Sequence, residues 1–257
     1  MTLKDVVFAN VGGLKTACVT REQLVDIIAS QVDMVRERSA SQPMVVFDSN
    51  GHGISLANSD KAFYEALTQA DLIHADGQSV VSMSKWLGGV SIPERSATTD
   101  LMHDIPGRKG LTLSHFLLGG SENVVSQCGE LLTKRYANFK LNGTHHGYFD
   151  KQNCDQLIAQ INAAKPDILW VGLGKPEEQF WVIQHKDKLQ VPVIITCGGC
   201  YNYVTGDYCR APMWMQKAGI EWLHRLLTQP KKLFWRYLTT NPHSVYCVLK
   251  HKFRQTT

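Results

Sequence analysis

The stretch Asp71-Leu-Ile-His-Ala-Asp76-Gly77 combines a short apolar strand with a carboxylate and a glycine at its end. In an open α/β sheet, ligands bind at the carboxyl ends of the strands, where the backbone turns out of the sheet. We therefore expect the Asp76 carboxylate to lie over a crevice, while Gly77 lets the chain turn sharply and a ligand come close. Because Asp-Gly is also a common turn signal, this stretch taken alone is equally compatible with a plain turn.

The pattern of this stretch recurs along the chain. Apolar runs end at polar or glycine turns over residues 44–51, 113–120, 168–174 and 193–199. Segments with apolar residues at helical spacing separate these runs. The alternation predicts a Rossmann-like α/β fold, a mostly parallel sheet with helices on both faces. We expect an α/β catalytic domain over residues 1–210 and a helical, basic C-terminal appendage over residues 211–257.

Composition restricts the class of protein. The 257 residues are 44% hydrophobic and 19% charged, as expected of a globular protein with a core. No apolar run approaches the roughly 20 residues that cross a bilayer, and the N-terminus lacks the basic and apolar regions of a signal peptide. Seven scattered cysteines indicate free thiols in a reducing cytoplasm rather than a disulfide framework.

The net charge of +4 is unevenly distributed along the chain. No Asp or Glu follows Glu221, and the tail beyond it carries seven cations, Arg225, Lys231, Lys232, Arg236, Lys250, Lys252 and Arg254. Aromatic residues are interleaved with them, namely Trp222, Phe234, Trp235, Tyr237, Tyr246 and Phe253. A basic, aromatic-rich end indicates an anionic partner such as a membrane surface, a phosphate or a nucleic acid. A solvated helix face whose aromatic side chains pack inward is the alternative.

Two aspartates follow apolar strands one strand–helix–strand unit apart. Asp48 begins the turn Asp48-Ser-Asn50-Gly51, and Asp76 lies 28 residues further on. If the two strands are neighbours, both carboxylates open onto one crevice. Two carboxylates close together raise the pKa of one of them, which can make a general acid or base. Two turn aspartates that cap helices are the alternative.

Glycine turns are candidates for phosphate binding. Gly172-Leu-Gly174 lacks the third glycine of a dinucleotide fingerprint, so we do not expect a nicotinamide-dependent dehydrogenase. A glycine turn that leads into a helix N-terminus still suits a phosphate, and Gly198-Gly199 and, more weakly, Gly119-Gly120 have the same character. For each turn, tight packing of strand against helix is the alternative.

We expect neither a metal ion nor a cofactor. Cys197-x-x-Cys200, Cys209 and His145-His146 have no second Cys-x-x-Cys beside them, and Cys197 directly follows an apolar strand. The chain also has no Asp-x-Asp pair of the kind that holds a divalent ion on a nucleotide diphosphate, and no Gly-x-Ser-x-Gly elbow.

Several ordered motifs carry a family resemblance. The later ones are Asp167-Ile-Leu-Trp-Val-Gly-Leu-Gly-Lys-Pro-Glu-Glu-Gln-Phe-Trp181, Cys197-Gly-Gly, Gly206-x-x-x-Arg210-Ala-Pro212-x-Trp214, Gly219-Ile-Glu221-Trp222-Leu-His-Arg225-Leu and Gln229-Pro230. The earlier ones are Ala75-Asp76-Gly77, Pro93-Glu-Arg95, the Leu118-Gly119 turn and His146-Gly147-Tyr148-Phe149. Over residues 44–238 the chain resembles the WecG/TagA/CpsF glycosyltransferases, glycosyltransferase family 26.

The resemblance implies an inverting, metal-independent transferase. Such enzymes move a sugar from a nucleotide donor, usually a UDP-sugar, to a polyprenyl-diphosphate-linked saccharide. In this family the aspartate matching Asp76 is the proposed catalytic base, and the arginine matching Arg95 lines the pocket. The C-terminal segment with the matches to Arg225 and Arg236 is thought to close over the site, contact the diphosphate and reach the membrane.

The chain departs from the family pattern in two places. The family usually has Thr-x-Asn where this chain has Asp48-Ser-Asn50, so Asp48 changes the donor or acceptor sugar or shares the role of base with Asp76. The family also usually reads Gly-x-Pro-x-Gln-Glu, whereas Glu178-Gln179 has the reverse order. Both departures leave the donor sugar open between glucose, N-acetylmannosamine and a related hexose.

We therefore predict a UDP-sugar-dependent hexosyltransferase of bacterial exopolysaccharide, capsule or cell-surface glycan synthesis. It would be cytoplasmic and peripheral on the inner face of the cytoplasmic membrane, held at that anionic surface by the basic C-terminal segment. We expect no nucleic-acid partner and leave homo-oligomerisation open. A non-catalytic protein that binds a nucleotide sugar or an anionic lipid is the alternative, and a nucleic-acid binder that uses the basic tail is a third.

The predicted site has two groups of residues. Asp76 and Asp48 are the candidate catalytic residues. The candidate substrate-binding residues are Asn50, Gly77, Arg95, Gly119, Tyr148, Gly172, Gly174, Glu178, Gln179, Gly198, Gly199, Arg210, Arg225 and Arg236.

Overall fold

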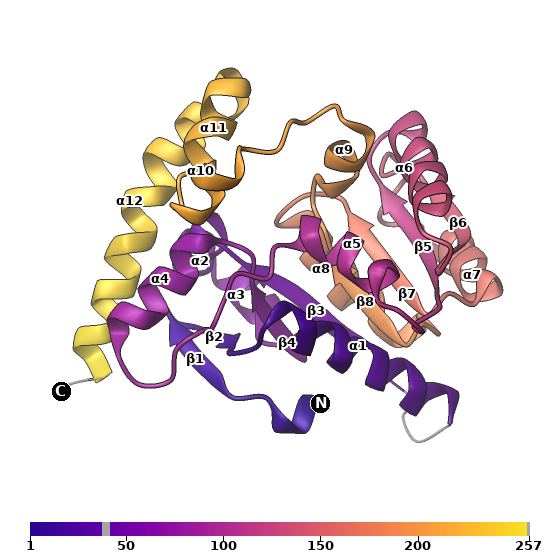
Figure 1. Cartoon of the computed structure of the whole chain (residues 1–257), viewed down its shortest axis with the longest axis horizontal. Coiled ribbons are helices and arrows are strands. Elements are labelled where there is room, and N and C mark those ends of the chain that lie inside the picture. Colours follow the sequence, from indigo (N-terminus) through magenta and orange to yellow (C-terminus); the bar gives the residue numbers. More distant parts are fainter. Residues whose placement is uncertain (38–41, 256–257) are drawn as a thin grey trace.

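The computed structural model describes residues 1–37 and 42–255 and has an α/β fold (Figure 1). Its main sheet has six strands, all parallel, in the order β4-β3-β8-β7-β5-β6. Their bounds are β3 Met44–Ser49, β4 Leu72–Ala75, β5 Leu113–Gly119, β6 Phe139–His145, β7 Ile168–Gly172 and β8 Val193–Thr196. The predicted parallel sheet and helices on both faces are confirmed.

Each face of the sheet carries its own apolar core. Along β3, Val45 and Phe47 belong to one cluster of buried side chains, and Met44 and Val46 belong to the other. This alternation follows from the two-residue period of a strand. The first core includes side chains of α2 (Gly51–Ala57), α3 (Lys61–Leu67), α4 (Gln78–Leu87), α7 (Asp155–Ala164) and α8 (Glu177–His185). The second includes side chains of α1 (Arg21–Arg36), α5 (Thr98–Gly107), α6 (Glu122–Arg135) and α9 (Cys200–Thr205).

Local sequence signals set the helix boundaries near the site. The side chain of Thr20 caps α1 and forms a reciprocal capping box with Gln23. The side chain of Asn50 caps α2 by accepting a hydrogen bond from the backbone N–H of Gly53 at 3.0 Å. Because Asn50 follows β3 directly, its role as a cap holds it at the carboxyl end of the sheet.

The N-terminal segment is an antiparallel hairpin, as its sequence predicts. Strands β1 (Phe8–Val11) and β2 (Leu14–Ala17) flank Gly12 and Gly13, which both have positive φ. Two short 3₁₀ helices are also present, η1 (Leu3–Asp5) and η2 (Lys186–Lys188).

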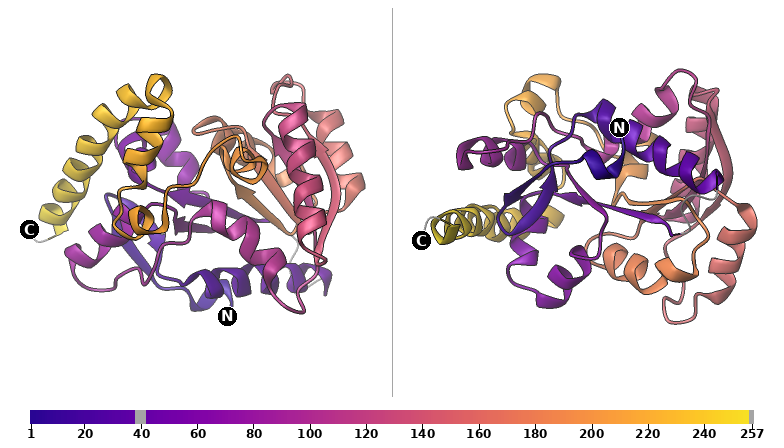
Figure 2. Two further views of the ribbon diagram at one scale, coloured as in Figure 1. Left: turned by 45° about the horizontal axis from the view of Figure 1, so that its top comes forward. Right: turned by 90° about the horizontal axis from the view of Figure 1, so that it is seen from below.

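The C-terminal segment consists of three helices, α10 (Met213–Lys217), α11 (Glu221–Thr228) and α12 (Pro230–Gln255). The sequence predicts one helical segment to about residue 239, broken near Pro230. The structure has a further break at Gly219, whose φ of +73° ends α10, and α12 continues to Gln255. Helix α12 runs along one side of the molecule (Figures 1 and 2).

Helix α12 is docked on the α/β body. It packs against α2, with Leu233, Tyr237, Ser244, Cys247 and Val248 buried. A hydrogen bond also joins the two helices, with the Ser55 hydroxyl 2.8 Å from Nδ1 of His243. Within the described chain, no helix is both long and apolar enough to cross a membrane.

Candidate active site

The carboxyl ends of β3 and β4 bring Asp48 and Asp76 together, as the sequence predicts. The strands are neighbours, with Ser49 in register with Ala75. The amide nitrogen of Asn50 donates to Oδ2 of Asp48 at 2.9 Å and to Oδ2 of Asp76 at 3.3 Å. Since its Oδ1 caps α2, Asn50 uses both ends of its amide to fix the two carboxylates relative to the helix.

Asp76 is a partly buried carboxylate that remains ionised at neutral pH. Burial opposes its charge, but the Arg95 guanidinium and then the hydrogen bond from the backbone N–H of Thr98 hold its pKa below the ordinary value. The Thr98 N–H lies 2.9 Å from Oδ1 of Asp76. The pKa of Asp76 is therefore lowered, because the Arg95 charge and the Thr98 hydrogen bond outweigh the effect of burial.

Asp48 forms a buried ion pair with Lys175, a residue of the β7–α8 turn. The ammonium of Lys175 donates to Oδ2 of Asp48 at 2.8 Å and to its backbone carbonyl at 3.2 Å. The side chains of Lys175 and Asp48 keep only 8% and 10% of their surface exposed. With its charge paired in this way, Asp48 suits ligand binding better than proton abstraction.

The carboxyl group of Glu178 fills the space between two glycine turns. Its Oε2 accepts hydrogen bonds from the backbone N–H groups of Gly174 and Gly198, each at 3.0 Å. Burial, and then the negative charge of Asp48, raise the pKa of Glu178 to about 7. The two N–H groups that the sequence offers to a phosphate are thus occupied by a side chain of the protein.

The glycines at the strand ends allow close approach of the backbone. A Cβ on Gly119, whose φ is +133°, would lie 2.2 Å from the carbonyl oxygen of Gly172. A Cβ on Gly172 would lie 2.8 Å from the carbonyl oxygen of Gly198. At Gly119 and Gly172 the tight-packing alternative therefore accounts for the glycine. Gly77 serves the site differently, because a Cβ there would lie 3.2 Å from Cβ of Asn50.

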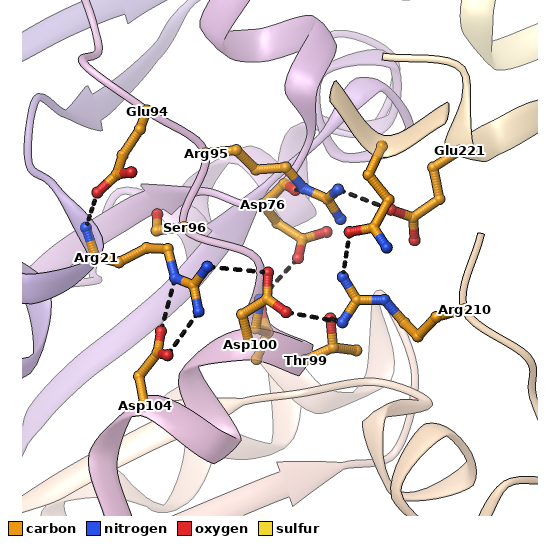
Figure 3. A network of polar contacts seen from close by, with 12 residues as sticks. Arg21, Asp76, Glu94, Arg95, Ser96, Thr99, Asp100, Asp104, Arg210 and Glu221 are labelled. Carbon is orange, nitrogen blue, oxygen red and sulfur yellow. Dashed lines mark hydrogen bonds and ion pairs between the residues drawn. The ribbon is translucent and has the colours of Figure 1, made fainter. Parts of the chain in front are cut away.

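Arg95 links Asp76 to the C-terminal helices. Its Nε donates to the backbone carbonyl of Asp76 at 2.6 Å, and its Nη1 donates to Glu221 of α11 at 2.7 Å (Figure 3). The side chains of Arg95 and Glu221 are both largely buried. Arg95 therefore contacts the backbone of Asp76, and its guanidinium is paired with the carboxylate of Glu221.

The side chain of Arg210 is held by other residues of the protein. Its guanidinium donates to Thr99, Asp100 and Gln216 at 2.8–2.9 Å (Figure 3). These contacts tie the segment after α9 to the first turn of α5. These protein acceptors engage both terminal nitrogens of Arg210 and leave its buried Nε without a partner within the described residues, so Arg210 is a weaker candidate for binding substrate than the sequence suggests.

Among the described residues, Arg225 and Arg236 are tail arginines with hydrogen-bonding capacity to spare. The Nε of each is buried and has no hydrogen-bond partner within the described chain. The guanidinium of Arg225 lies over the ring of Tyr203, 5.7 Å from its centroid. Burial opposes the charge of Arg225, but the hydroxyl groups of Tyr237 and Tyr203, and then the charge of Asp76, raise its pKa. Buried guanidinium groups without partners are expected where a ligand anion binds.

The sequence as a whole was compared with known proteins. The model of the glycosyl transferase WecG/TagA/CpsF family matches residues 9–257. The chain belongs to this family. It is therefore a glycosyltransferase, and the resemblance seen in its motifs is confirmed.

Two relatives of this glycosyltransferase come from Staphylococcus aureus. The protein of strain NCTC 8325 is 30% identical over 219 residues, covering 81% of each chain. The protein of strain MRSA252 is 29% identical with the same coverage. Both are named N-acetylglucosaminyldiphosphoundecaprenol N-acetyl-beta-D-mannosaminyltransferase.

Some predicted residues of the transferase lie away from the two aspartates or act indirectly. Tyr148 follows β6, the far edge strand from β4, and is 80% exposed. Gln179 is fully buried, and its amide nitrogen lies 3.3 Å from Oε1 of Glu178. Gly199 caps α9 beside Tyr208. Among the described residues, no hydrogen bond joins any of these three to Asp48 or Asp76.

Two residues of the transferase site are absent from the sequence-based prediction, Lys175 and Thr98. Lys175 lies in the Gly174-Lys-Pro176 turn. A cation in a turn at the end of a strand is the sequence signal that could have identified it. Thr98 acts through its backbone N–H, which residue identity does not reveal. Within residues 1–37 and 42–255, no three His, Cys, Asp or Glu side chains gather as a metal site requires.

Proposed function

We propose that this glycosyltransferase moves a hexose from a UDP-sugar to a polyprenyl-diphosphate-linked saccharide, with inversion and without a metal ion. The reaction would serve the synthesis of exopolysaccharide, capsule or another cell-surface glycan. The observation that carries the proposal is the ionised Asp76 carboxylate at the end of β4. The names of the staphylococcal relatives, which specify a lipid-diphosphate acceptor, support it.

Asp76 is the proposed base. Thr98 holds Oδ1 of this carboxylate and Asn50 orients Oδ2. In the proposed step, Asp76 takes the proton from a hydroxyl of the acceptor as its oxygen attacks the anomeric carbon of the donor. The bond from the anomeric carbon to the phosphate oxygen breaks, and UDP leaves with the electron pair. Attack from the face opposite UDP inverts the configuration.

Arg225 and Arg236 are proposed to stabilise the charge that develops on the leaving diphosphate. Their buried Nε groups lack partners in the described chain, so a phosphate oxygen would complete their hydrogen bonding. Arg95 is a third cation of the pocket, and its ion pair with Glu221 connects the proposed base to α11. Helices α10–α12 would thus act as a lid.

The exposed face of α12 is proposed to rest on the membrane. Opposite the face that packs on α2, it presents Phe234, Trp235, Leu238, Val245 and Tyr246. Lys231 and Lys250 are exposed on the same helix, and no acidic residue follows Glu221. The side chains of Lys232 and Arg254 lie outside the described residues. Aromatic and basic side chains together suit an anionic lipid surface.

The test is acceptor-dependent release of UDP in the presence of EDTA. A panel of UDP-sugars would be offered with a short-chain polyprenyl-diphosphate sugar, with wild type beside Asp76→Asn. We expect release from one hexose donor in the wild type and its loss in the variant. Release that requires a divalent ion would refute metal independence. UDP binding with no turnover of any donor would support a protein that binds nucleotide sugars without transferring them.

A further inference from the structure

The ion pair of Asp48 and Lys175 is costly to bury and has no evident role in the stability of the fold. Taking two opposite charges out of water costs about as much as their attraction returns, so a buried ion pair is weak evidence for a stabilising role. Asp48 and Lys175 come from different strand ends, β3 and the turn after β7, and meet at the carboxyl edge of the sheet. A pair held there is placed to contact a ligand.

The pair retains hydrogen-bonding capacity. Lys175 makes two contacts, both to Asp48, whereas an ammonium has three N–H groups. On Asp48, the contacts from Lys175 and Asn50 both fall on Oδ2. Oδ1 of Asp48 therefore has no hydrogen-bond partner in the part of the chain that the structure describes. One acceptor and one donor remain side by side, and both side chains keep slight exposure.

The pair lies beside the proposed base and in the neighbourhood of a proposed diphosphate cation. The single amide nitrogen of Asn50 contacts both Asp48 and Asp76. The charges of Lys175 and Arg236 both act on His52, whose pKa is lowered to about 4 chiefly by burial. A donor whose anomeric carbon faces Asp76 and whose diphosphate faces Arg236 would bring its hexose near this pair.

We infer that Asp48 and Lys175 bind two adjacent free hydroxyl groups of the donor hexose, beginning at carbon 2, and thereby select an unsubstituted hexose over a 2-acetamido sugar. The inference rests on the proposed function and specifies its donor. Carbon 2 adjoins the anomeric carbon, just as Asp48 adjoins Asp76 through Asn50. One hydroxyl donates to Oδ1 of Asp48, and its neighbour accepts from Lys175.

An acetamido group at carbon 2 suits this environment less well than a hydroxyl. The groups around the pair are polar or charged and include Asn50, His52 and Glu178. The N–H of an acetamido group can still donate to Oδ1 of Asp48, so the discrimination comes from the added acetyl group. Its methyl group would displace water from the ion pair without returning a hydrogen bond, which is unfavourable.

The test is calorimetric binding of UDP, UDP-glucose, UDP-galactose, UDP-N-acetylglucosamine and UDP-N-acetylmannosamine to the full-length protein. We expect at least one unsubstituted hexose donor to bind about tenfold or more tightly than its 2-acetamido counterpart. The double variant Asp48→Thr/Lys175→Ala, which leaves no unpaired charge, should reduce this ratio to about one while UDP alone binds as before. Asp187→Asn, at an exposed position, is the control.

The outcomes separate the inference from the proposed function. Equal binding of both donor classes by the wild type, or a ratio unchanged in the double variant, would overturn the inference and leave the transferase reaction standing. Discrimination without acceptor-dependent UDP release would refute the reaction and retain the recognition of hydroxyls. Failure to bind UDP or any UDP-sugar would refute both. Melting temperatures of all variants check that each is folded, and Asp48→Asn serves as a second variant if the double variant is not.

Discussion

The two halves of the strand-end edge contain similar groups in opposite situations. At the ends of β3 and β4, the carboxylates of Asp48 and Asp76 keep oxygen atoms available to a ligand. At the ends of β7 and β8, the carboxyl group of Glu178 occupies the backbone N–H groups of both glycine turns. One half is open to substrate and the other is closed by its own side chain.

The difference between Asp76 and Glu178 shows what sets the charge of a buried carboxyl group. Glu178 is fully buried and Asp76 is partly buried; the pKa of Asp76 is lowered and that of Glu178 is raised to about 7. Asp76 has the Arg95 guanidinium beside it. Glu178 faces the negative charge of Asp48, and Lys175, the nearby cation, is hydrogen-bonded to Asp48. Burial opposes the charge of both groups; the Arg95 charge and the Thr98 hydrogen bond outweigh it at Asp76, whereas Lys175 does not outweigh it at Glu178.

The largest effect is expected at the open half. Asp76→Asn keeps an oxygen for the Thr98 N–H but cannot take a proton, so transfer should fall about 10²- to 10⁴-fold. UDP affinity and melting temperature should change little. The measurement is UDP release beside a calorimetric titration with UDP, with Asp187→Asn as the matched control. Retention of more than a tenth of the wild-type rate would remove Asp76 from the role of base.

The next effect separates two arginines of the C-terminal segment. Arg225→Ala should weaken UDP binding about 10- to 100-fold and leave stability nearly unchanged, because the Arg225 side chain donates no hydrogen bond within the described residues. Arg210→Ala should do the reverse, with a loss of about 1–3 kcal/mol in the free energy of unfolding, since it removes the hydrogen bonds to Asp100 and Gln216. Calorimetry and urea denaturation measure the two effects. Equal losses of UDP affinity would contradict the assignment.

The closed half is expected to control pH-dependent stability. The pKa of Glu178 is raised from 4.5 to about 7 in the folded protein. Between these values the folded state holds a proton that the unfolded state has released, so the free energy of unfolding falls as pH rises and levels off above pH 7. Glu178→Gln should remove on the order of 1–3 kcal/mol of this fall while keeping transfer within a fewfold of wild type.

Urea denaturation at several pH values between 4.5 and 8 measures that change. Glu177→Gln is the matched control, because Glu177 is the neighbouring residue and its side chain is exposed. The control should keep the wild-type dependence on pH. If Glu178→Gln also keeps it, or abolishes transfer, the closed half takes part in the reaction and the comparison fails.

The smallest effect lies far from both halves. Trp235, on the exposed face of α12, has 71% of its surface exposed. Trp235→Ser together with Leu238→Ser should lower binding to vesicles containing anionic lipid about five- to tenfold without altering UDP affinity. Sedimentation with vesicles measures the effect, and Tyr64→Ser, at an exposed aromatic residue of α3, is the control. Unchanged sedimentation would place the membrane contact elsewhere.

The sequence predicts the fold and the central pair of the site because both depend on local patterns. Apolar runs that end in turns specify the parallel sheet. The spacing of Asp48 and Asp76 predicts one helix between two neighbouring strands. The structure has two helices there, α2 and α3, separated by a break at Asn58–Asp60, and the strands still pair. The spacing therefore identified the neighbouring strands but not the form of their connection.

Other features depend on contacts between distant segments and could not be predicted from pattern. Lys175 reaches Asp48 across 127 positions, and Glu221 reaches Arg95 across 126. The same is true of the glycine turns, which look alike in sequence whether their N–H groups face a phosphate or a side chain such as Glu178. Which of these applies is decided by the tertiary packing that brings the β7 and β8 turns together.

Helix α2 has a consequence for when the enzyme works. This rod of seven residues is about 10 Å long. Asn50 begins it beside both aspartates, and α12 rests along it. A tilt of α12 on contact with lipid would therefore change the distance between the carboxylates of Asp48 and Asp76. On the proposed function, such a linkage would let the enzyme sense its location, so that activated sugar is spent only where the lipid-borne acceptor is present and is spared from hydrolysis elsewhere.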